Sequence, residues 1–155
     1  IECLSGIPGS VGATPIQNVG AYGQEVSNVI KSVKALNTET LKFEVFSKKS
    51  CAFSYRNSMF KSENKGKYII TEVTFNLEFN GEPVIKYKEL YDLLVYDDIY
   101  KSLQNNISKL IYVRNTVLEI RAGKSMIYNE NDSESFSCGS FFTNPVIDKK
   151  AFKNF

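Results

Sequence analysis

The sequence predicts an α+β fold, in which antiparallel strands pair with one another and helices pack to one side of them. Two runs of strand-forming residues, 28–37 and 41–46, flank the four residues 37–40, a composition typical of a hairpin loop. Residues 68–79 alternate between apolar and polar side chains, which predicts a half-buried antiparallel strand. The Asn-Gly pair at 80–81 is expected to end that strand in a turn.

The second half of the chain has helical spacing. Residues 86–104 look helical but uneven, and the Asn-Asn pair that follows them interrupts the pattern. We expect Ser108 to cap a further helix that runs to about Arg121 and ends at Gly123. A polar loop over 124–139 follows, and a short helix is expected to begin near Asp148.

The boundary between two units is predicted near Asn105, the weakest point of the pattern. We therefore divide the chain into 1–105 and 106–155. The chain does not begin with Met, and its first residues resemble the middle of a domain, so we expect a part of the parent protein to precede Ile1.

Composition excludes several classes of function. The 155 residues are 43% hydrophobic, which is enough for a real core, and the net charge is only +2. Because the lysines are spread along the chain, we expect no nucleic-acid partner. No apolar run approaches the roughly 20 residues of a membrane span, so we expect no membrane partner. No secretory signal opens the chain, and we expect a cytoplasmic location.

Histidine is absent, which excludes a Ser-His-Asp or Cys-His mechanism within this chain. The cysteines Cys3, Cys51 and Cys138 do not have zinc spacing, so we predict reduced thiols and no metal site. Any chemistry must come from other side chains or from a cofactor.

A glycine-rich stretch covers residues 6–23, with the sequence GIPGSVGATPIQNVGAYG. Glycine lets the backbone approach a flat ring or a phosphate without an intervening side chain, and exposed N–H groups favour an anion. The stretch is neither a Walker loop nor a dinucleotide-binding fingerprint. On composition alone, a tight structural turn explains it equally well.

Two further segments hold candidate reactive residues. In CAFSYRNSMF, residues 51–60, the cation Arg56 beside a tyrosine and apolar residues is able to hold a carboxylate, although a structural ion pair is the simpler explanation. In CGSFFTNP, residues 138–145, Ser140 lies between a glycine and a hydrophobic pair. A hydroxyl there is a weak acid, and a serine in a turn is the plainer interpretation.

Taken together and in this order, the three segments resemble the UDP-N-acetylenolpyruvoylglucosamine reductase family. The segment VRNTVLEIR followed by Lys124 and Met126 is similar to the family helix that leads into the substrate domain. The resemblance spans nearly the whole chain, and only about 88–106 resembles an insertion. It implies that 1–105 is part of an FAD-binding lobe and that 106–155 begins an α+β substrate-binding domain.

The resemblance also implies an activity: NADPH reduces FAD, and UDP-N-acetylglucosamine enolpyruvate is then reduced in peptidoglycan synthesis. By motif position, Arg56 stabilises the substrate carboxylate and the enol intermediate, and Ser140 is the proton donor. Tyr87, Lys124 and Asn144 match substrate-binding positions. The implied FAD contacts are Ile7, Gly9, Gly12, Ala13, Thr14, Ile16, Gly20 and Tyr22.

The family pattern extends beyond this chain at both ends. Its first FAD lobe would lie before Ile1, and its third catalytic residue, a glutamate, would lie after Phe155. We therefore expect the chain by itself to bind FAD weakly or not at all and to be inactive.

Two alternatives stay open. An oxidase of the vanillyl-alcohol-oxidase type shares the FAD lobes, but the segment around Ser140 is typical of the reductase's substrate domain. A non-catalytic α+β domain that binds a nucleotide sugar or a protein is the other alternative. Loss of Arg56 or Ser140 would support it, and both residues are present.

Overall fold

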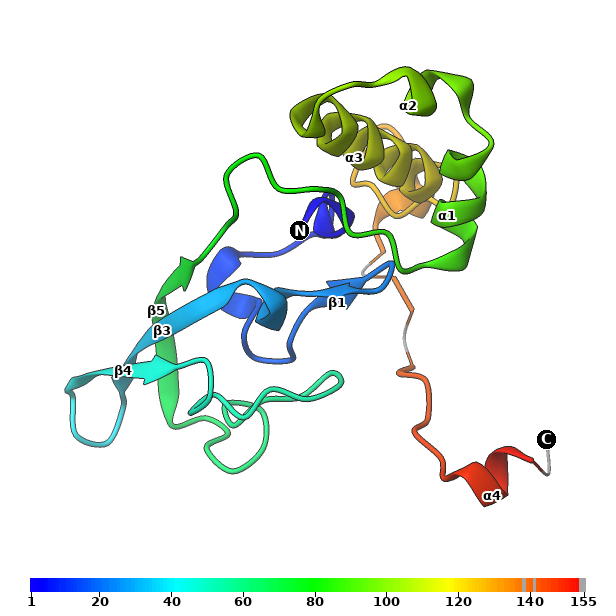
Figure 1. Ribbon diagram of the computed structural model, residues 1–155. Helices are drawn as coiled ribbons and strands as arrows, with labels where there is room; N and C mark the ends of the chain where they lie inside the picture. Colours follow the sequence, from blue (N-terminus) through cyan, green and yellow to red (C-terminus); the bar gives the residue numbers. More distant parts are fainter. Residues whose placement is uncertain (138, 141, 154–155) are drawn as a thin grey trace.

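The computed structural model describes residues 1–137, 139–140 and 142–153 (Figure 1). A small antiparallel sheet lies beside a cluster of three helices, and the N-terminal stretch runs between the two (Figure 1). The predicted α+β class with antiparallel strands is confirmed.

The sheet has the order β4-β3-β5, with β3 (Ile30–Asn37) in the centre, β4 (Phe43–Ser47) on one edge and β5 (Tyr68–Phe75) on the other. The predicted hairpin between the first two strands is confirmed. Its turn is held by the Asn37 side chain, whose Oδ1 accepts hydrogen bonds from the backbone N–H groups of Glu39 and Thr40 at 2.9 and 3.2 Å.

The third strand is shorter than predicted. β5 ends at Phe75, which is the partner of Ile30 at the start of β3. One more backbone hydrogen bond follows, from the N–H of Asn76 to the carbonyl of Val29 at 2.7 Å, and the described pairing then stops. Leu77 and Phe79, which were expected on the buried face, are 59% and 94% exposed. The alternation in sequence continues past 75, but a strand also needs a neighbouring strand to pair with.

One face of the sheet is covered by residues 51–60. Val33 and Ala35 from β3 are fully buried against this segment. The rings of Phe46, Phe60 and Tyr68 meet edge to face, with centroid distances of 5.0 to 6.0 Å. Such pairs add to the area that they bury, so this aromatic cluster anchors the 51–60 segment to the sheet.

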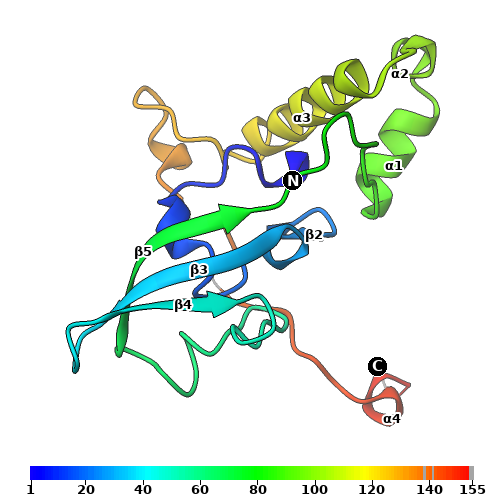
Figure 2. The ribbon, with the colours of Figure 1, turned by 60° about the vertical axis from the view of Figure 1, so that its left-hand side comes forward.

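The helices form a second core beside the sheet (Figure 2). They are α1 (Lys88–Val95), α2 (Asp98–Ser102) and α3 (Asn106–Ala122), and they pack with the turn η1 (Glu2–Leu4). The buried residues of this core are Cys3, Leu90, Leu94, Val113 and Val117. They come from both sides of the predicted boundary at 105, and the division into two units stays a prediction.

The cap of α3 differs from the prediction. Asn105, not Ser108, is the N-cap: its Oδ1 accepts a hydrogen bond of 2.8 Å from the backbone N–H of Ser108. The expectation was wrong because both residue types cap helices, and only the backbone shows where the helical angles begin. The end of α3 at Gly123 is confirmed, with its N–H donating to the carbonyl of Glu119 at 2.9 Å.

The N-terminal stretch contains short turns and one small ladder. The turn η2 (Val11–Ala13) lies within the glycine-rich stretch, and the pairing of β1 (Gly20–Ala21) with β2 (Gln24–Glu25) was not predicted. The turns η3 (Val26–Asn28) and η4 (Ser133–Ser135) and the helix α4 (Lys149–Phe152) complete the elements, and α4 confirms the expected helix near 148.

Two findings concern only the described residues. None of their helices is both long enough and apolar enough to cross a bilayer. Cys3 and Cys51 are buried free thiols whose pKa values burial raises to about 12 and about 11. Cys138, the third predicted thiol, lies outside the described residues.

Candidate functional site

Arg56 is fixed by its own backbone and by a contact with the glycine-rich stretch. It has a φ of 52°, in the left-handed region, within the turn closed by the Ser54–Asn57 bridge. Its Nη2 donates a hydrogen bond of 2.7 Å to the carbonyl oxygen of Gly20. The guanidinium carbon also lies 5.1 Å from the centre of the Tyr55 ring. The structure therefore joins two of the three segments singled out in the sequence.

Two more side chains connect the same segments. The Nδ2 of Asn18, a buried side chain, donates to the carbonyl of Ser54 at 3.0 Å and to the Glu25 carboxylate at 2.8 Å. The buried Ser58 hydroxyl donates to the carbonyl of Ile16 at 2.6 Å. Because the donors are buried, losing either bond leaves a polar group without water to replace its partner. Residues 16–20 and 54–58 thus form one unit.

The glycines of this stretch have different roles. A Cβ on Gly20 would lie 2.7 Å from the carbonyl oxygen of Gln24 and 2.8 Å from Nη1 of Arg56, so the packing itself requires glycine there. A Cβ on Gly12 would meet the carbonyl of Ile70 at an ordinary 3.5 Å, and one on Gly9 would meet nothing within 4 Å. The backbone near Gly9 is therefore uncovered, as a close approach by a flat ring or a phosphate requires.

The other predicted cofactor positions lie in or next to the turn η2. Gly12 and Ala13 belong to it, and the Thr14 hydroxyl donates to the carbonyl of Val11 at 2.8 Å, which engages that proton within the turn. Ile7 lies just before η2 and donates its N–H to the carbonyl of Leu4.

A second cluster brings together Tyr22, Tyr87 and Lys124. The two tyrosine rings meet edge to face at 5.3 Å. Lys124, just beyond the end of α3, donates to both carboxylate oxygens of Glu89 on α1, at 3.1 and 3.2 Å. The hydrogen bond to Glu89, with the charge of that residue and the nearby tyrosines, raises the pKa of Lys124. A predicted cofactor residue and two predicted substrate residues are thus neighbours.

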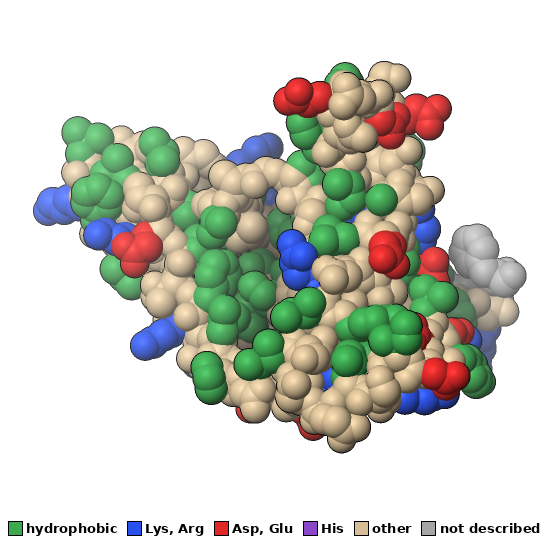
Figure 3. Space-filling model, turned by 90° about the horizontal axis from the view of Figure 1, so that it is seen from above, with side chains coloured by type: hydrophobic (Ala, Val, Ile, Leu, Met, Phe, Trp, Pro, Cys, Tyr) green, Lys and Arg blue, Asp and Glu red, His purple; other side chains and the backbone are tan. Residues whose placement is uncertain are grey.

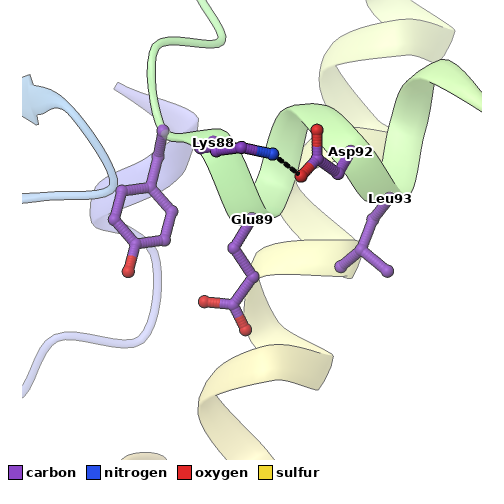
Figure 4. Close-up of a pocket in the computed structure, with 5 residues that line it drawn as sticks. Lys88, Glu89, Asp92 and Leu93 are labelled. Carbon is purple, nitrogen blue, oxygen red and sulfur yellow. Dashed lines mark hydrogen bonds and ion pairs between the residues drawn. The ribbon is translucent and has the colours of Figure 1, made fainter.

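A shallow, open depression of about 550 Å³ lies beside this cluster, along the first turns of α1. Figure 4 shows its lining residues, with Lys88 paired to Asp92 and with the Glu89 side chain directed to the other side. Sequence reasoning assigned no role to Glu89, because the resemblance did not place the segment 88–106.

Arg121 is a further residue that sequence reasoning missed. It is 7% exposed, and its Nη2 donates to the carbonyls of Gly6 at 3.5 Å and of Met126 at 3.3 Å, whereas its Nε has no partner among the described residues. A buried cation held by carbonyls at the start of the glycine-rich stretch supports the turn there. The sequence pattern placed Arg121 only at the end of a helix, and no local spacing indicates a contact with Gly6, which is 115 residues away.

No hydrogen bond or ion pair within the described residues joins Ser140 or Asn144 to these clusters. Both are exposed, in the extended segment that leads away to α4 (Figure 1). Ser140 makes no hydrogen bond within the described part of the chain that would join it to Arg56. Phe141, its neighbour in the motif, lies outside the described residues. The roles of Ser140 and Asn144 remain predictions.

A second cavity, of about 580 Å³, lies between the segment 77–86, the first residues of the chain and α3. Its lining mixes apolar side chains such as Leu77 and Ile111 with the charged Glu78 and Arg114. Figure 3 shows hydrophobic side chains around a hollow on the upper face of the molecule. None of the residues predicted for cofactor or substrate lines this second cavity.

Among the described residues no group of three or more ligands is placed to hold a metal ion.

Comparison with known proteins gives close relatives that are longer than this chain. UDP-N-acetylenolpyruvoylglucosamine reductase from Streptomyces coelicolor is 43% identical over 158 aligned residues, which cover 100% of this chain and 39% of the relative. The proteins of the same name from Streptomyces avermitilis and Cutibacterium acnes are 44% and 45% identical, over 95% and 94% of this chain and 39% and 37% of theirs. No family model matches the chain.

The fold also matches a solved structure. The crystal structure of UDP-N-acetylenolpyruvylglucosamine reductase (MurB) from Thermus caldophilus superimposes with a TM-score of 0.56 at 22% identity, over 93% of this chain and 40% of that protein. At 22% identity the structural match is evidence for the fold alone. The relatives that are more than 40% identical are the evidence that the proteins are homologous. The chain is a homologue of part of the UDP-N-acetylenolpyruvoylglucosamine reductases and spans about two fifths of the length of the relatives it matches.

Proposed function

We propose that this chain is part of a cytoplasmic FAD-dependent reductase that uses NADPH to convert UDP-N-acetylglucosamine enolpyruvate to UDP-N-acetylmuramate in peptidoglycan synthesis. The relatives named above support this function. The observation in the structure that carries it is the hydrogen bond from Arg56 to Gly20. This bond places the candidate cation on the glycine-rich stretch 6–23, the candidate cofactor loop.

The cofactor loop fits FAD in one respect that the structure makes visible. The backbone around Gly9 is uncovered, and Gly12 adds no side chain to the turn η2. Ile7, Ala13, Thr14, Ile16, Gly20 and Tyr22 are the further positions of this chain that would hold the group. FAD, when bound, supplies the hydride chemistry that no side chain of this chain offers. On this proposal residues 1–105 belong to the FAD-binding lobe and 106–155 to the start of the substrate-binding domain.

Arg56 is suited to hold a carboxylate at a fixed place. One of its nitrogens is engaged by Gly20, and the remaining N–H groups of the guanidinium fork are free of any carboxylate among the described residues. A fixed cation stabilises negative charge that develops during a reaction, and it needs no rearrangement at that moment. We assign Arg56 to the substrate carboxylate and to the enolate that forms from it.

Ser140 is assigned as the donor of the proton to that enolate. A free hydroxyl is a weak acid, so the assignment requires that the full protein bring Ser140 next to the reacting carbon and stabilise its oxygen. Tyr87 is assigned to cover the substrate, and Lys124 and Asn144 to its nucleotide part.

Stopped-flow flavin absorbance on the full-length protein tests this function. NADPH is added first, and UDP-N-acetylglucosamine enolpyruvate follows in the absence of oxygen. Bleaching by NADPH and rapid recovery with the enolpyruvyl substrate are expected. Recovery with oxygen alone would instead indicate an oxidase, and a protein without any flavin signal would be a binding domain.

A further inference from the structure

We propose that Glu89 occupies, on Lys124, the position that a phosphate group of the bound nucleotide takes, so that Glu89 competes with the ligand and sets its affinity. This inference rests on the proposed function, because it takes Lys124 as a substrate residue. It assigns a role to a residue in the segment 88–106.

The geometry resembles that of a lysine holding a phosphate. The Nζ of Lys124 lies 3.1 and 3.2 Å from the two oxygens of one carboxylate, and a phosphate presents a similar pair of oxygens. Both side chains are about half exposed, at 44% and 45%, so an incoming ligand reaches the pair from solvent.

The ion pair lies next to residues that are predicted to contact the cofactor and the substrate. Glu89 is two residues beyond Tyr87, whose ring contacts Tyr22 at 5.3 Å. The neighbouring cation on α1, Lys88, is engaged by Asp92 and lies apart from the Glu89 side chain (Figure 4). Of these two lysines, Lys124 and not Lys88 is the cation that a phosphate in this cluster would meet, and Glu89 is the carboxylate that it would have to displace.

The strength of the pair is compatible with displacement. An exposed ion pair between flexible side chains shifts an equilibrium by about fivefold at most. A diphosphate carries more negative charge than one carboxylate, and it is therefore able to replace Glu89 on Lys124. In the free protein the ion pair joins α1 to the end of α3.

The experiment is a calorimetric titration of the full-length protein with UDP at low ionic strength. Glu89→Gln is expected to bind UDP about two- to fivefold more tightly than the unchanged protein, because the competing charge is gone. Lys124→Met is expected to weaken UDP binding, and adding Glu89→Gln to Lys124→Met should change nothing further. Asp98→Asn is the matched control, since it removes one exposed acidic charge paired with Lys101 in the same helical cluster.

Unchanged or weaker UDP binding by Glu89→Gln would overturn the proposal, as would equal tightening by Asp98→Asn, which would indicate a general charge effect. Circular dichroism of each variant checks that the helices are kept. Flavin recovery in the unchanged protein is measured separately. If it fails, the reductase assignment falls, and the UDP titrations still decide the role of Glu89.

Discussion

The Nη2 of Arg56 lies 2.7 Å from the carbonyl oxygen of Gly20, and this hydrogen bond places the candidate reactive cation on the candidate cofactor loop. The two residues are 36 positions apart in sequence. Arg56 also has a left-handed backbone, a conformation that costs free energy in a non-glycine residue. The position of its guanidinium therefore depends on the packing around Gly20.

Gly20→Ala is expected to destabilise the protein by about 2 kcal/mol. The added Cβ would lie 2.7 Å from the backbone oxygen of Gln24, which cannot move as a side-chain end can, and 2.8 Å from Arg56. Urea unfolding measures the free energy of unfolding. The same substitution should lower turnover, because Arg56 must give way.

Gly12→Ala is the control for this prediction. Its Cβ would have ordinary contact distances and its backbone angle is open to alanine, so the free energy of unfolding should change by no more than about 0.5 kcal/mol. Equal destabilisation by both substitutions would show that the contact with Gln24 and Arg56 is not what makes glycine necessary at 20.

Local patterns in the sequence predicted the elements well where the pattern and the pairing coincide. The hairpin around Asn37 and the C-terminal end of α3 at Gly123 followed from residue type and spacing alone. Phe79 illustrates the limit of such a pattern: its alternation is regular, but β3 has no residue left to pair with it.

The candidate site was predicted as separate segments, not as an assembly. The hydrogen bonds from Asn18 to Ser54 and from Arg121 to Gly6 span 36 and 115 residues, and no local spacing encodes them. Burial of an asparagine or an arginine is uncommon and depends on partners that only the folded chain supplies. The ion pair of Glu89 with Lys124 was missed for the same reason.

Arg121→Met is expected to change the free energy of unfolding by no more than about 1 kcal/mol, whereas Arg121→Ala should cost about 2 to 3 kcal/mol. The buried guanidinium has no carboxylate partner among the described residues, and its Nε is unsatisfied, so the cost of burying the charge offsets its two bonds to carbonyls. Methionine keeps the volume, and alanine leaves a cavity. Urea unfolding of both variants decides. A large loss with methionine would show that the carbonyl bonds outweigh the cost of burial.

Asp97 should make stability depend on acid pH. The hydrogen bond from the Tyr112 hydroxyl, at 2.6 Å, together with backbone N–H donors at the start of α2, lowers the pKa of Asp97 below its ordinary value. Its contribution is therefore fully present above the ordinary pKa of about 3.9 and is lost as the pH falls through the lowered value. Asp97→Asn keeps a capping oxygen, so its deficit relative to the unchanged protein should shrink below about pH 4.

Tyr112 should make stability depend on alkaline pH. Its hydrogen bond to Asp97 raises its pKa, so its contribution is present below the ordinary value of about 10 and is lost as the pH rises through the raised value. The midpoints of urea unfolding from pH 2 to 11 measure the loss of stability at both the acid and the alkaline end. Parallel curves for Asp97→Asn and the unchanged protein in the acid range would contradict the assignment.

Ser140→Ala separates the two half-reactions of the proposed enzyme. Ser140 is exposed, so the substitution should leave the fold and the reduction of flavin by NADPH unchanged. Recovery of flavin absorbance on adding the enolpyruvyl substrate should be lost, because a group that acts only in the transition state affects turnover more than binding. Arg56→Ala should also impair this second step, and with weaker substrate binding. If Ser140→Ala instead blocks reduction by NADPH, the serine acts on the flavin site and not on the enolate.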